Sequence, residues 1–573
     1  MTGNEAIARG AYEAGVTVAT AYPGTPSTEI LENIGKHYNE ISAEWSPNEK
    51  VALEVGIGSA IVGARTLVTM KHVGVNVAAD PLMSFTYTGV NGGLVLVSAD
   101  DPGMHSSQNE QDNRVFGKFA KIPILEPADS GEAKSFLIQA FDISEKFDTP
   151  VLFRMTTRTS HAQSLVELAE RNEVGLRPYV KNTMKNVLLP AHARLRHPIV
   201  EERVLKLAEY NETSNLNKIE MQDKKMGIIT SGAVYQYVKE VLPEASVLKL
   251  GMTYPLPKKL ITEFITSVDT CYVIEELEPF IEDQIKAWGL KIIGKEVFPL
   301  LGEFSPEIIA KAFGKDYHAL TQTEKLPVRP PVLCPGCPHR SVFYAIGKLK
   351  LRVSGDIGCY TLAAAPPLNG MDTCICMGAS ISAAHGMEKA RGREFAAGTV
   401  AVIGDSTFMH SGITGLMDIV YNGGTSTVLI LDNDITAMTG QQENPATGIT
   451  LKKQLTRKVD LELLCHALGI ERVQSVDAYD VSAVEKAIKE EVGAAEPSVV
   501  IIRRPCVLLK GKGPTGMVHV NKDKCKSCGM CAKVGCPAIV FKGSKMPIIN
   551  ETLCNGCLVC AQVCPFGALE EVK

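Results

Sequence analysis

Several features that would point to particular classes of protein are missing from this sequence. Lysine and arginine number 59 against 64 aspartates and glutamates, which leaves a net charge of −5 and no basic patch of the kind that binds nucleic acid. No apolar run approaches the length that spans a bilayer, and the first residues lack the basic and apolar regions of a signal peptide. We therefore expect a cytoplasmic protein without nucleic-acid or membrane partners.

The length and the cysteine pattern narrow the class further. At 573 residues the chain is long enough for three to five domains, because single hydrophobic cores stop growing well below that size. The cytosol keeps thiols reduced, so the 16 cysteines are not expected to form disulfides. Eight of them lie within the last 49 residues at short, regular spacings, which favours metal ligation.

Residues 399–433 contain two apolar strands that flank a helix. The first strand ends at Gly404, Asp405 and Ser406, where glycine permits a tight turn and serine can cap the helix that follows. The second ends 28 residues after Asp405, at Asn433. The carboxyl ends of parallel strands meet at one edge of a sheet, so Asp405 and Asn433 should lie side by side and suit Mg²⁺ and a diphosphate. An ordinary strand-helix-strand crossover explains the same residues without a ligand.

A second group of candidate residues lies in residues 1–165, which read as an α/β domain. The loop that contains Thr25 follows a strand, and loops at that edge bind ligands in open parallel sheets. Glu49 opens a helix rich in alanine and glycine, which can pack closely against a neighbouring element. The simpler interpretation of Glu49 is an acidic residue that complements the helix dipole, and Glu54 is the alternative acid on the same helix.

A polar loop and two later segments carry weaker signals. His105, Gln108 and Arg114 offer donors to a carboxylate or to a neighbouring subunit, although a solvated loop explains them equally well. Residues 166–222 are charged and lack clear strand signals, so we expect a helical linker. Residues 223–325 alternate strand and helix patterns and read as a further α/β unit.

Cysteines outside the C-terminal region occur in different settings. Cys334 and Cys337 form a C-x-x-C hairpin, which can hold a cluster, act as a redox pair or remain two buried thiols. Cys359 and Cys506 each follow a strand pattern. The remaining four are predicted to be buried thiols: Cys271, Cys374, Cys376 and Cys465.

The strongest motif is a repeated cysteine run in residues 513–573. Each copy has three cysteines, with two residues between successive cysteines, and then a fourth cysteine followed by proline. Bacterial two-cluster ferredoxins have this pattern, and the fourth cysteine of each run ligates the other cluster. One [4Fe–4S] cluster is assigned to Cys525, Cys528, Cys531 and Cys564. The other is assigned to Cys536, Cys554, Cys557 and Cys560. A structural zinc site is the alternative.

One spacing in this module departs from the ferredoxin pattern. Four residues separate Cys531 from Cys536, where the usual run has three. The longer connection could still deliver Cys536, but we expect its cluster to be labile or to lose an iron.

Together these motifs resemble those of 2-oxoacid:ferredoxin oxidoreductases. The segment at Asp405 and the pair Asp432 and Asn433 are similar to that family's thiamine diphosphate motif, GDG followed by NN, with departures at Ser406 and Asp432. The resemblance implies that the cofactor is contacted by Met377, Gly378, Gly404, Asp405, Ser406 and Asn433. It implies that Mg²⁺ is held by Asp405, Asn433 and the carbonyl of Ile435.

The same resemblance implies three further roles. Glu49 matches the glutamate that protonates the pyrimidine ring of thiamine and is the candidate catalytic residue. Thr25 matches a loop that touches the 2-oxoacid substrate. A third, proximal [4Fe–4S] cluster would be held by Cys334, Cys337, Cys359 and Cys506.

The resemblance covers nearly the full length, and the order of the motifs closely resembles that of the large (α) subunits of indolepyruvate ferredoxin oxidoreductases. It implies a multidomain α/β fold of thiamine-binding parallel sheets with flanking helices, plus a small α+β two-cluster ferredoxin domain. The implied order is a pyrimidine-binding domain in 1–165, a helical linker in 166–222, a transketolase C-terminal-like domain in 223–325, a diphosphate-binding domain in 326–512 and the ferredoxin domain in 513–573.

The implied reaction is the oxidative decarboxylation of an aryl 2-oxoacid such as indolepyruvate. CoA would take the acyl group to give aryl-acetyl-CoA and CO₂, and the clusters would pass electrons to a soluble ferredoxin. The implied partners include a smaller β subunit with a γ-type catalytic domain, in a hetero-oligomer with two α chains. Three alternatives stay open: a pyruvate-type 2-oxoacid oxidoreductase, a non-oxidative thiamine decarboxylase or synthase, and an electron-transfer subunit without its own thiamine site.

Overall fold

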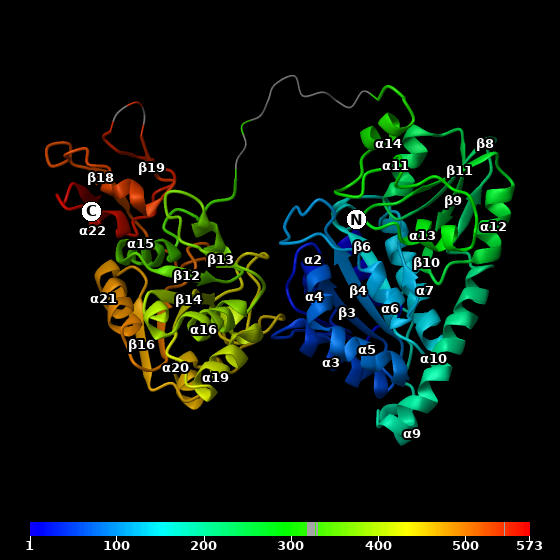
Figure 1. Cartoon of the computed structure of the whole chain (residues 1–573), viewed down its shortest axis with the longest axis horizontal. Helices are drawn as coiled ribbons and strands as arrows, with labels where there is room; N and C mark the ends of the chain where they lie inside the picture. Colours follow the sequence, from blue (N-terminus) through cyan, green and yellow to red (C-terminus); the bar gives the residue numbers. More distant parts are fainter. Residues whose placement is uncertain (318–326, 328–329, 542, 544, 573) are drawn as a thin grey trace. The chain divides into compact units, whose positions relative to one another are not determined.

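The computed structural model describes residues 1–317, 327, 330–541, 543 and 545–572. The chain divides into two compact units, Met1–Lys325 and Leu326–Lys573 (Figure 1). The domain boundary predicted between residues 325 and 326 lies outside the described residues. Each unit contains its own parallel sheet, which confirms the predicted α/β class.

A seven-stranded sheet forms the centre of the first unit. Its strands are β1 (Val18–Ala21), β2 (Ser42–Trp45), β3 (Thr66–Lys71), β4 (Leu94–Asp100), β5 (Ile124–Leu125), β6 (Val151–Thr156) and β10 (Met252–Tyr254). They lie in the order β10-β5-β6-β4-β3-β1-β2, with only β10 antiparallel to its neighbour. All residues of β3, β4 and β6 are buried, as expected for a parallel sheet covered on both faces.

Helices cover this sheet. They are α1 (Gly3–Glu13), α2 (Thr28–His37), α3 (Glu49–Ile61), α4 (His72–Val77), α5 (Ala79–Thr88), α6 (Arg114–Ala120), α7 (Ser130–Phe147) and α8 (Thr157–His161). The close packing predicted for the small residues of α3 occurs only on the side of the helix that faces β3. A Cβ at Gly56 would lie 2.5 Å from the Val68 side chain of β3, whereas Gly58 faces open space.

The rest of the first unit is built around a four-stranded sheet. Its strands, in spatial order, are β11 (Thr270–Ile274), β8 (Asp223–Ser231), β9 (Ala245–Leu250) and β7 (Lys218–Glu220). Its helices are α11 (Val234–Val241), α12 (Lys258–Thr266), α13 (Phe280–Ala287) and α14 (Pro306–Ala312). One hydrophobic core joins both sheets, because Leu96 of β4 and Leu248 of β9 belong to the same buried cluster.

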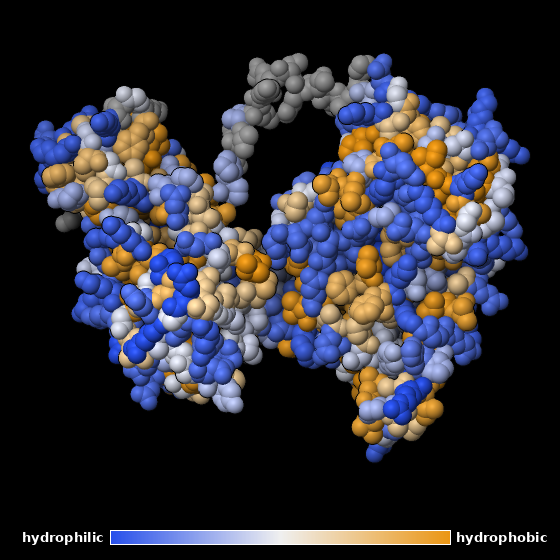
Figure 2. Space-filling view, viewed as in Figure 1, coloured by the Kyte–Doolittle hydropathy of each residue, from blue (hydrophilic) through white to orange (hydrophobic). Residues whose placement is uncertain are grey.

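The segment predicted as a helical linker is helical only in part. It contains α9 (Thr183–Asn186) and α10 (Pro190–Asn211), but residues 164–182 form an irregular strap along the first domain. The backbone N–H of Asn172 donates to the Glu13 carbonyl at 2.9 Å, and that of Arg177 to the Gly63 carbonyl at 3.0 Å. Apolar side chains are exposed on α9, on the connection that follows it and on the start of α10, where orange atoms gather at the lower right of Figure 2: Met184, Val187, Leu188, Leu189 and Leu195.

The second unit is built on a six-stranded parallel sheet. In spatial order the strands are β13 (Thr373–Cys374), β12 (Arg352–Gly355), β14 (Thr399–Gly404), β15 (Thr427–Asp432), β17 (Ser498–Arg503) and β16 (Arg472–Asp477). The longer helices are α15 (His339–Leu349), α16 (Ala379–Arg391), α19 (Ile413–Tyr421), α20 (Leu461–Ala467) and α21 (Val481–Val492).

A small α+β region completes the second unit. It consists of two antiparallel strand pairs and the short helix α22 (Val559–Gln562): β18 (Met517–Val520) with β21 (Leu569–Val572), and β19 (Ile539–Val540) with β20 (Ile548–Ile549). Val534 and Val559 of this region share a buried cluster with Tyr479 and Val481 of the parallel-sheet domain. Across the described residues, no helix has both the length and the apolar character needed to cross a bilayer.

Candidate functional site

Asp405 lies at the carboxyl edge of the second unit's sheet, as predicted. β14 and β15 are adjacent and parallel, with Gly404 opposite Leu431, so the residues after each strand leave the sheet at the same edge. The Asp405 side chain is only 2% exposed. One of its oxygens accepts the Ser406 N–H at 2.8 Å. The other, Oδ2, is buried without a hydrogen-bond partner in the described part of the chain.

The residues around Asp405 fit a hard cation. Burial and the nearby Asp432 carboxylate raise the pKa of Asp405 to about 8, because the hydrogen bonds that this carboxylate accepts do not offset the two effects. Asn433 is also buried, and its side-chain oxygen accepts the Ile435 N–H at 3.3 Å, which curls the chain after β15. Asp432 instead pairs with Arg503 at 3.2 Å. A carboxylate with an unsatisfied oxygen, an amide oxygen and a nearby backbone carbonyl form a donor set that suits Mg²⁺.

Ser406 does not cap the helix after β14, contrary to the prediction. The helix α18 (Asp405–Thr407) already begins at Asp405 with Gly404 as its N-cap, so Ser406 lies inside the first turn. Its hydroxyl accepts a hydrogen bond from Thr436 at 2.8 Å. The serine that departs from the GDG motif therefore ties this turn to the segment after Asn433.

The turn at Met377 and Gly378 is held by two residues that sequence reasoning missed. Gly378 has φ +84°, and a Cβ there would lie 2.3 Å from Ser411 Oγ, so only glycine fits. Ser411, in the π-helical segment Phe408–Gly412, donates to the Met377 carbonyl at 2.9 Å. Asp356 accepts the Gly378 N–H at 2.9 Å. A polar residue directly after an apolar strand was the available signal for Asp356.

In the first unit, Glu49 rather than Glu54 is the buried acid of α3. Asn48 caps the helix by accepting the Val51 N–H at 2.8 Å. α4 closes over the acid, because a Cβ at Gly74 would lie 2.8 Å from Glu49 Oε1. Glu54 is exposed and pairs with Lys50. The local surroundings of Glu49 therefore match a carboxyl group that meets a ligand out of contact with solvent.

Lys71 is a further candidate that the sequence did not reveal. It ends β3 next to the loop of Thr25, where a Cβ at Gly24 would lie 3.0 Å from the Lys71 side chain. It is 9% exposed and donates to the Ser106 carbonyl at 2.6 Å. Burial lowers the pKa of Lys71 to about 8, against the opposing effect of Asp101. The loop of Thr25 thus has a buried amino group beside it.

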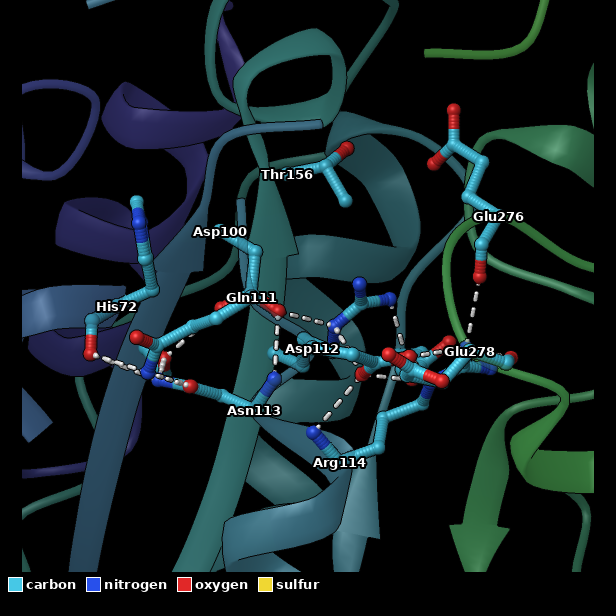
Figure 3. Close-up of polar contacts among 12 residues, drawn as sticks. His72, Asp100, Gln111, Asp112, Asn113, Arg114, Thr156, Glu276 and Glu278 are labelled. Atoms are coloured by element: carbon cyan, nitrogen blue, oxygen red, sulfur yellow. Dashed lines mark hydrogen bonds and ion pairs between the residues drawn. The ribbon is translucent and has the colours of Figure 1, made fainter. Parts of the chain in front are cut away.

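Arg114 is not available to a ligand, contrary to one interpretation of its loop. Its side chain is 1% exposed and binds Asp112 at 2.5 Å and Glu275 at 2.7 Å (Figure 3). It also donates to the Glu276 carbonyl at 2.9 Å. Arg154 pairs with Asp100 at 2.7 Å in the same network. Because Glu275 follows β11, the network joins the two sheets of the first unit.

The other two candidates of that loop are solvated. His105 is about half exposed and lies 3.1 Å from Glu303. Gln108 is exposed. These positions agree with the interpretation of a polar surface loop.

Two cavities in the C-terminal region are each lined by four cysteines. The first cavity is bordered by Cys525, Cys528, Cys531 and Cys564. The second is bordered by Cys536, Cys554, Cys557 and Cys560. These are the two predicted sets, each completed by the fourth cysteine of the other run. In the described ranges no three His, Cys, Asp or Glu side chains converge to hold one metal ion. A [4Fe–4S] cube needs a hollow between its thiolates instead, with one thiolate on each iron.

The four-residue connection before Cys536 is accommodated by a short 3₁₀ helix and a glycine. The helix spans Met530–Val534, and Gly535 follows with φ +70°, a conformation that favours glycine. Cys536 then reaches the second cavity. The longer spacing therefore still delivers the cysteine.

The four cysteines proposed for a proximal cluster are neighbours in the second unit. Cys337 and Cys506 are buried, and Cys337 N–H donates to the Cys334 carbonyl at 3.1 Å. Burial raises the pKa of Cys337 to about 12 and that of Cys359 to about 11, and the nearby thiolates add to both shifts. Cys359 is affected by both Cys334 and Cys506, so the set converges on one region.

The remaining cysteines divide into two pairs. Cys271 and Cys465 are buried, as predicted. Cys374 and Cys376 are exposed, so their prediction as buried thiols was wrong. They lie at β13, an edge strand, where side chains have fewer neighbours than in the centre of the sheet.

Three family models match parts of this chain. Residues 9–226 match the thiamine diphosphate-binding family of pyruvate flavodoxin/ferredoxin oxidoreductases, and residues 356–502 match the C-terminal TPP binding domain of thiamine pyrophosphate enzymes. Residues 547–570 match the 4Fe-4S binding domain family. This last match spans only the second cysteine run.

Full-length relatives are more informative. The chain is 42% identical over 612 residues to indolepyruvate oxidoreductase subunit IorA of Archaeoglobus fulgidus, covering 100% of this chain and 97% of the relative. It is 41% identical over 631 residues, with the same coverage, to the subunit of that name from Thermococcus kodakarensis. Among solved structures, a 2-oxoglutarate:ferredoxin oxidoreductase from Magnetococcus marinus matches with a TM-score of 0.46 and 17% identity, covering 55% of this chain and 64% of that chain. The chain therefore belongs to the family of indolepyruvate oxidoreductase IorA subunits, which are thiamine diphosphate-dependent 2-oxoacid:ferredoxin oxidoreductases.

Proposed function

We propose that this chain is the thiamine- and cluster-binding subunit of an enzyme that oxidatively decarboxylates aryl 2-oxoacids such as indolepyruvate. CoA takes the acyl group to give aryl-acetyl-CoA and CO₂, and electrons pass to a soluble ferredoxin. The name of the relatives supports the aryl substrate. A pyruvate-type 2-oxoacid is the second candidate.

One contact carries this proposal. The backbone N–H of Cys506, assigned to the proximal cluster, donates to the carbonyl of Asn433 at 3.0 Å. Asn433 is assigned to the metal that holds the diphosphate. A cluster ligand and a cofactor ligand are therefore hydrogen-bonded neighbours, which is the arrangement that an electron-transfer step directly after decarboxylation requires.

The site residues divide the work between them. Asp405, Asn433 and the carbonyl of Ile435 would hold Mg²⁺, with the turn of Met377 and Gly378 beside the cofactor. Bound thiamine diphosphate supplies the carbanion chemistry that releases CO₂ from a 2-oxoacid.

Two residues of the first unit are assigned roles of their own. The buried Glu49 would contact the pyrimidine ring of the cofactor. Lys71 provides a cation for the substrate carboxylate next to Thr25.

The order of the cysteine sets suggests a path for electron transfer. Pro335 and Gly336, which lie between Cys334 and Cys337, also border the second cysteine-lined cavity. Electrons would pass from the proximal set to this cavity and then to the cavity bordered by Cys528, which is the exposed member of its cysteine set. The protein would then carry three [4Fe–4S] clusters, two of them in the C-terminal region.

The proposed reaction also requires partner molecules. We include a smaller β subunit with a γ-type catalytic domain, assembled with two copies of this chain, and a cytoplasmic location where reduced ferredoxin is available. CoA and an aryl pyruvate are the small-molecule partners.

The decisive experiment is anaerobic reduction of ferredoxin by the purified chain, with and without the β subunit. Indolepyruvate, phenylpyruvate, pyruvate and 2-oxoglutarate are compared with CoA present, and omission of CoA is the control. Preference for the aryl acids supports the proposal. Activity on pyruvate or 2-oxoglutarate alone would contradict the aryl assignment, and no reduction by the complex of both subunits would contradict the enzyme as a whole.

A further inference from the structure

Arg340 is a buried cation between two parts of the second unit. It lies in the first turn of α15, three residues after Cys337, and its side chain is 3% exposed. Its guanidinium donates to the Cys334 carbonyl at 3.0 Å and to the Leu333 carbonyl. It also donates to the carbonyl of Gly535 at 2.5 Å and to that of Val534 at 3.4 Å. One side chain thus joins the C-x-x-C loop to the cysteine-rich C-terminal region.

The charge of Arg340 is not balanced by an acid. No carboxylate in the described ranges lies within ion-pair distance of it, unlike Arg114 and Arg154 of the first unit. Backbone carbonyls satisfy its N–H groups but carry no net charge, and a buried charge without a counter-ion is costly. Its contacts place Arg340 between two cysteine sets, because it donates to the carbonyl of Cys334 in one set and to that of Gly535, which directly precedes Cys536, in the other.

We propose that Arg340 is the shared counter-ion of two neighbouring iron–sulfur clusters and makes both of them easier to reduce. One is the proximal cluster and the other is the cluster of Cys536, Cys554, Cys557 and Cys560. A thiolate-bound [4Fe–4S] cluster is an anion that gains one further negative charge on reduction, so a fixed buried cation stabilises the reduced form more than the oxidised form. This role rests on the proposed function, because it needs clusters at these cysteines.

The unusual spacing before Cys536 gains an explanation from this role. Of the four residues between Cys531 and Cys536, the last two are Val534 and Gly535, whose carbonyls accept hydrogen bonds from Arg340. The equivalent connection after Cys560 has three residues. The longer connection therefore supplies acceptors for the cation while Cys536 still reaches its cavity.

A second contact holds the C-x-x-C loop close to the cysteine-rich C-terminal region. Asn555, between Cys554 and Cys557, donates to the Pro335 carbonyl at 3.1 Å. A Cβ at Gly336 would lie 2.2 Å from the Asn555 side chain, so the loop approaches to a distance that only glycine permits. Tyr479 also donates to the Gly336 carbonyl at 2.6 Å. The cation is thus held in a fixed position relative to both cysteine sets.

The test is a potentiometric titration of the anaerobically purified holoprotein, followed by electron paramagnetic resonance. Arg340→Met removes the charge with little change in volume, and Arg340→Lys keeps the charge. We expect lower midpoint potentials for the proximal cluster and the Cys536 cluster in Arg340→Met, a smaller shift in Arg340→Lys, and no shift for the cluster of Cys525. Lys533→Met is the matched control, since Lys533 is exposed and its charge is screened by water.

The outcomes separate this role from the proposed function. Unchanged potentials in Arg340→Met, or an equal shift of every cluster, overturn the counter-ion role while leaving the enzyme assignment intact. Iron loss from Arg340→Met but not from Arg340→Lys supports it, whereas iron loss from both variants shows a structural role alone and overturns it. If the wild type holds only the two C-terminal clusters, the shared role is overturned, because Arg340 then has a single cluster beside it. A wild type without any cluster overturns the proposed function and this role with it.

Discussion

Two buried polar sites, one in each unit, differ in how far their charged groups are compensated. In Met1–Lys325, the guanidinium groups of Arg114 and Arg154 meet the carboxylates of Asp100, Asp112 and Glu275 (Figure 3). In Leu326–Lys573, one oxygen of Asp405 is buried without a partner among the described residues, and four thiols surround each of two hollows.

This difference in compensation distinguishes buried polar groups that stabilise the fold from those that bind a ligand. Charges that satisfy one another hold the chain together, because each compensates the desolvation of the other. Groups that are buried and left unsatisfied cost free energy unless a ligand compensates them. This criterion assigns the Arg114 network to the fold and the edge of Asp405 to the cofactor. Each prediction below changes one side of this comparison.

The largest effect is expected from Asp405→Asn. The variant should bind no detectable thiamine diphosphate with Mg²⁺, because the amide removes the charge that the cation needs. The thermal stability of the cofactor-free protein should not fall, since the carboxylate is uncompensated there. Bound thiamine is measured by mass spectrometry and stability by calorimetry. Asp418→Asn, at an exposed position on α19, is the control, and retained cofactor in Asp405→Asn would contradict the assignment.

The second prediction concerns the cysteine-lined hollows. Cys554→Ser should lower the iron content by about four atoms per chain, the contents of one cluster, and remove one signal from the electron paramagnetic resonance spectrum. Cys376→Ser should leave the iron content unchanged, because this exposed thiol belongs to neither hollow. Equal iron in the two variants would exclude a cluster in the second cavity.

The third prediction concerns a substitution that breaks the buried ion-pair network of Arg114. Arg114→Met should reduce the free energy of unfolding of the first unit by about 3–5 kcal/mol, because Asp112 and Glu275 are left buried without their cation. The iron content of the second unit should not change. Arg158→Met is the control, since this arginine is more than half exposed and its pair with Glu303 should contribute under about 1 kcal/mol. Denaturant unfolding measures both variants, and similar losses would count against the comparison.

The smallest effect is expected at Lys71, whose amino group is buried but hydrogen-bonded. Lys71→Gln should raise the KM for the 2-oxoacid about 10- to 100-fold, as for the loss of a charge-assisted hydrogen bond. The control Lys36→Gln, at an exposed position on α2, should leave KM unchanged.

The same residue predicts a pH dependence. The pKa of Lys71 is lowered to about 8, so its charge is present below that pH and is lost as the pH rises through it. The KM of the wild type should therefore increase above about pH 8. Lys71→Arg should keep a low KM to higher pH, because arginine stays protonated. A KM that is independent of pH between about 7 and 9 would remove Lys71 from the substrate site.

The sequence predicted those features that local spacing encodes. The cysteine runs fixed which four thiols border each cavity, because ferredoxin ligands recur at short intervals. The edge position of Asp405 and Asn433 followed from two strand patterns separated by one helix. Glu49 was assigned through the resemblance to 2-oxoacid:ferredoxin oxidoreductases, because its position at the start of a helix of small residues left the helix-dipole interpretation open.

Features that depend on distant contacts were not predictable in this way. One partner of Arg114, Glu275, lies 161 residues away in the sequence, so a buried ion-pair network looked like a polar loop. The burial of Lys71 depends on the loops of Thr25 and Ser106, which no periodicity reveals. The exposure of Cys374 depends on the position of β13 at the edge of its sheet.

The pairing of β10 with β5 has a consequence for synthesis of the chain. The first sheet includes residues 252–254, far beyond the 165 residues that read as its domain. Until the ribosome has released that segment, β5 remains an open sheet edge that can pair with strands of other chains. A gene fragment that stops near residue 165 or 222 should therefore yield an aggregation-prone product, and useful truncations of this protein should extend at least through the end of its first compact unit.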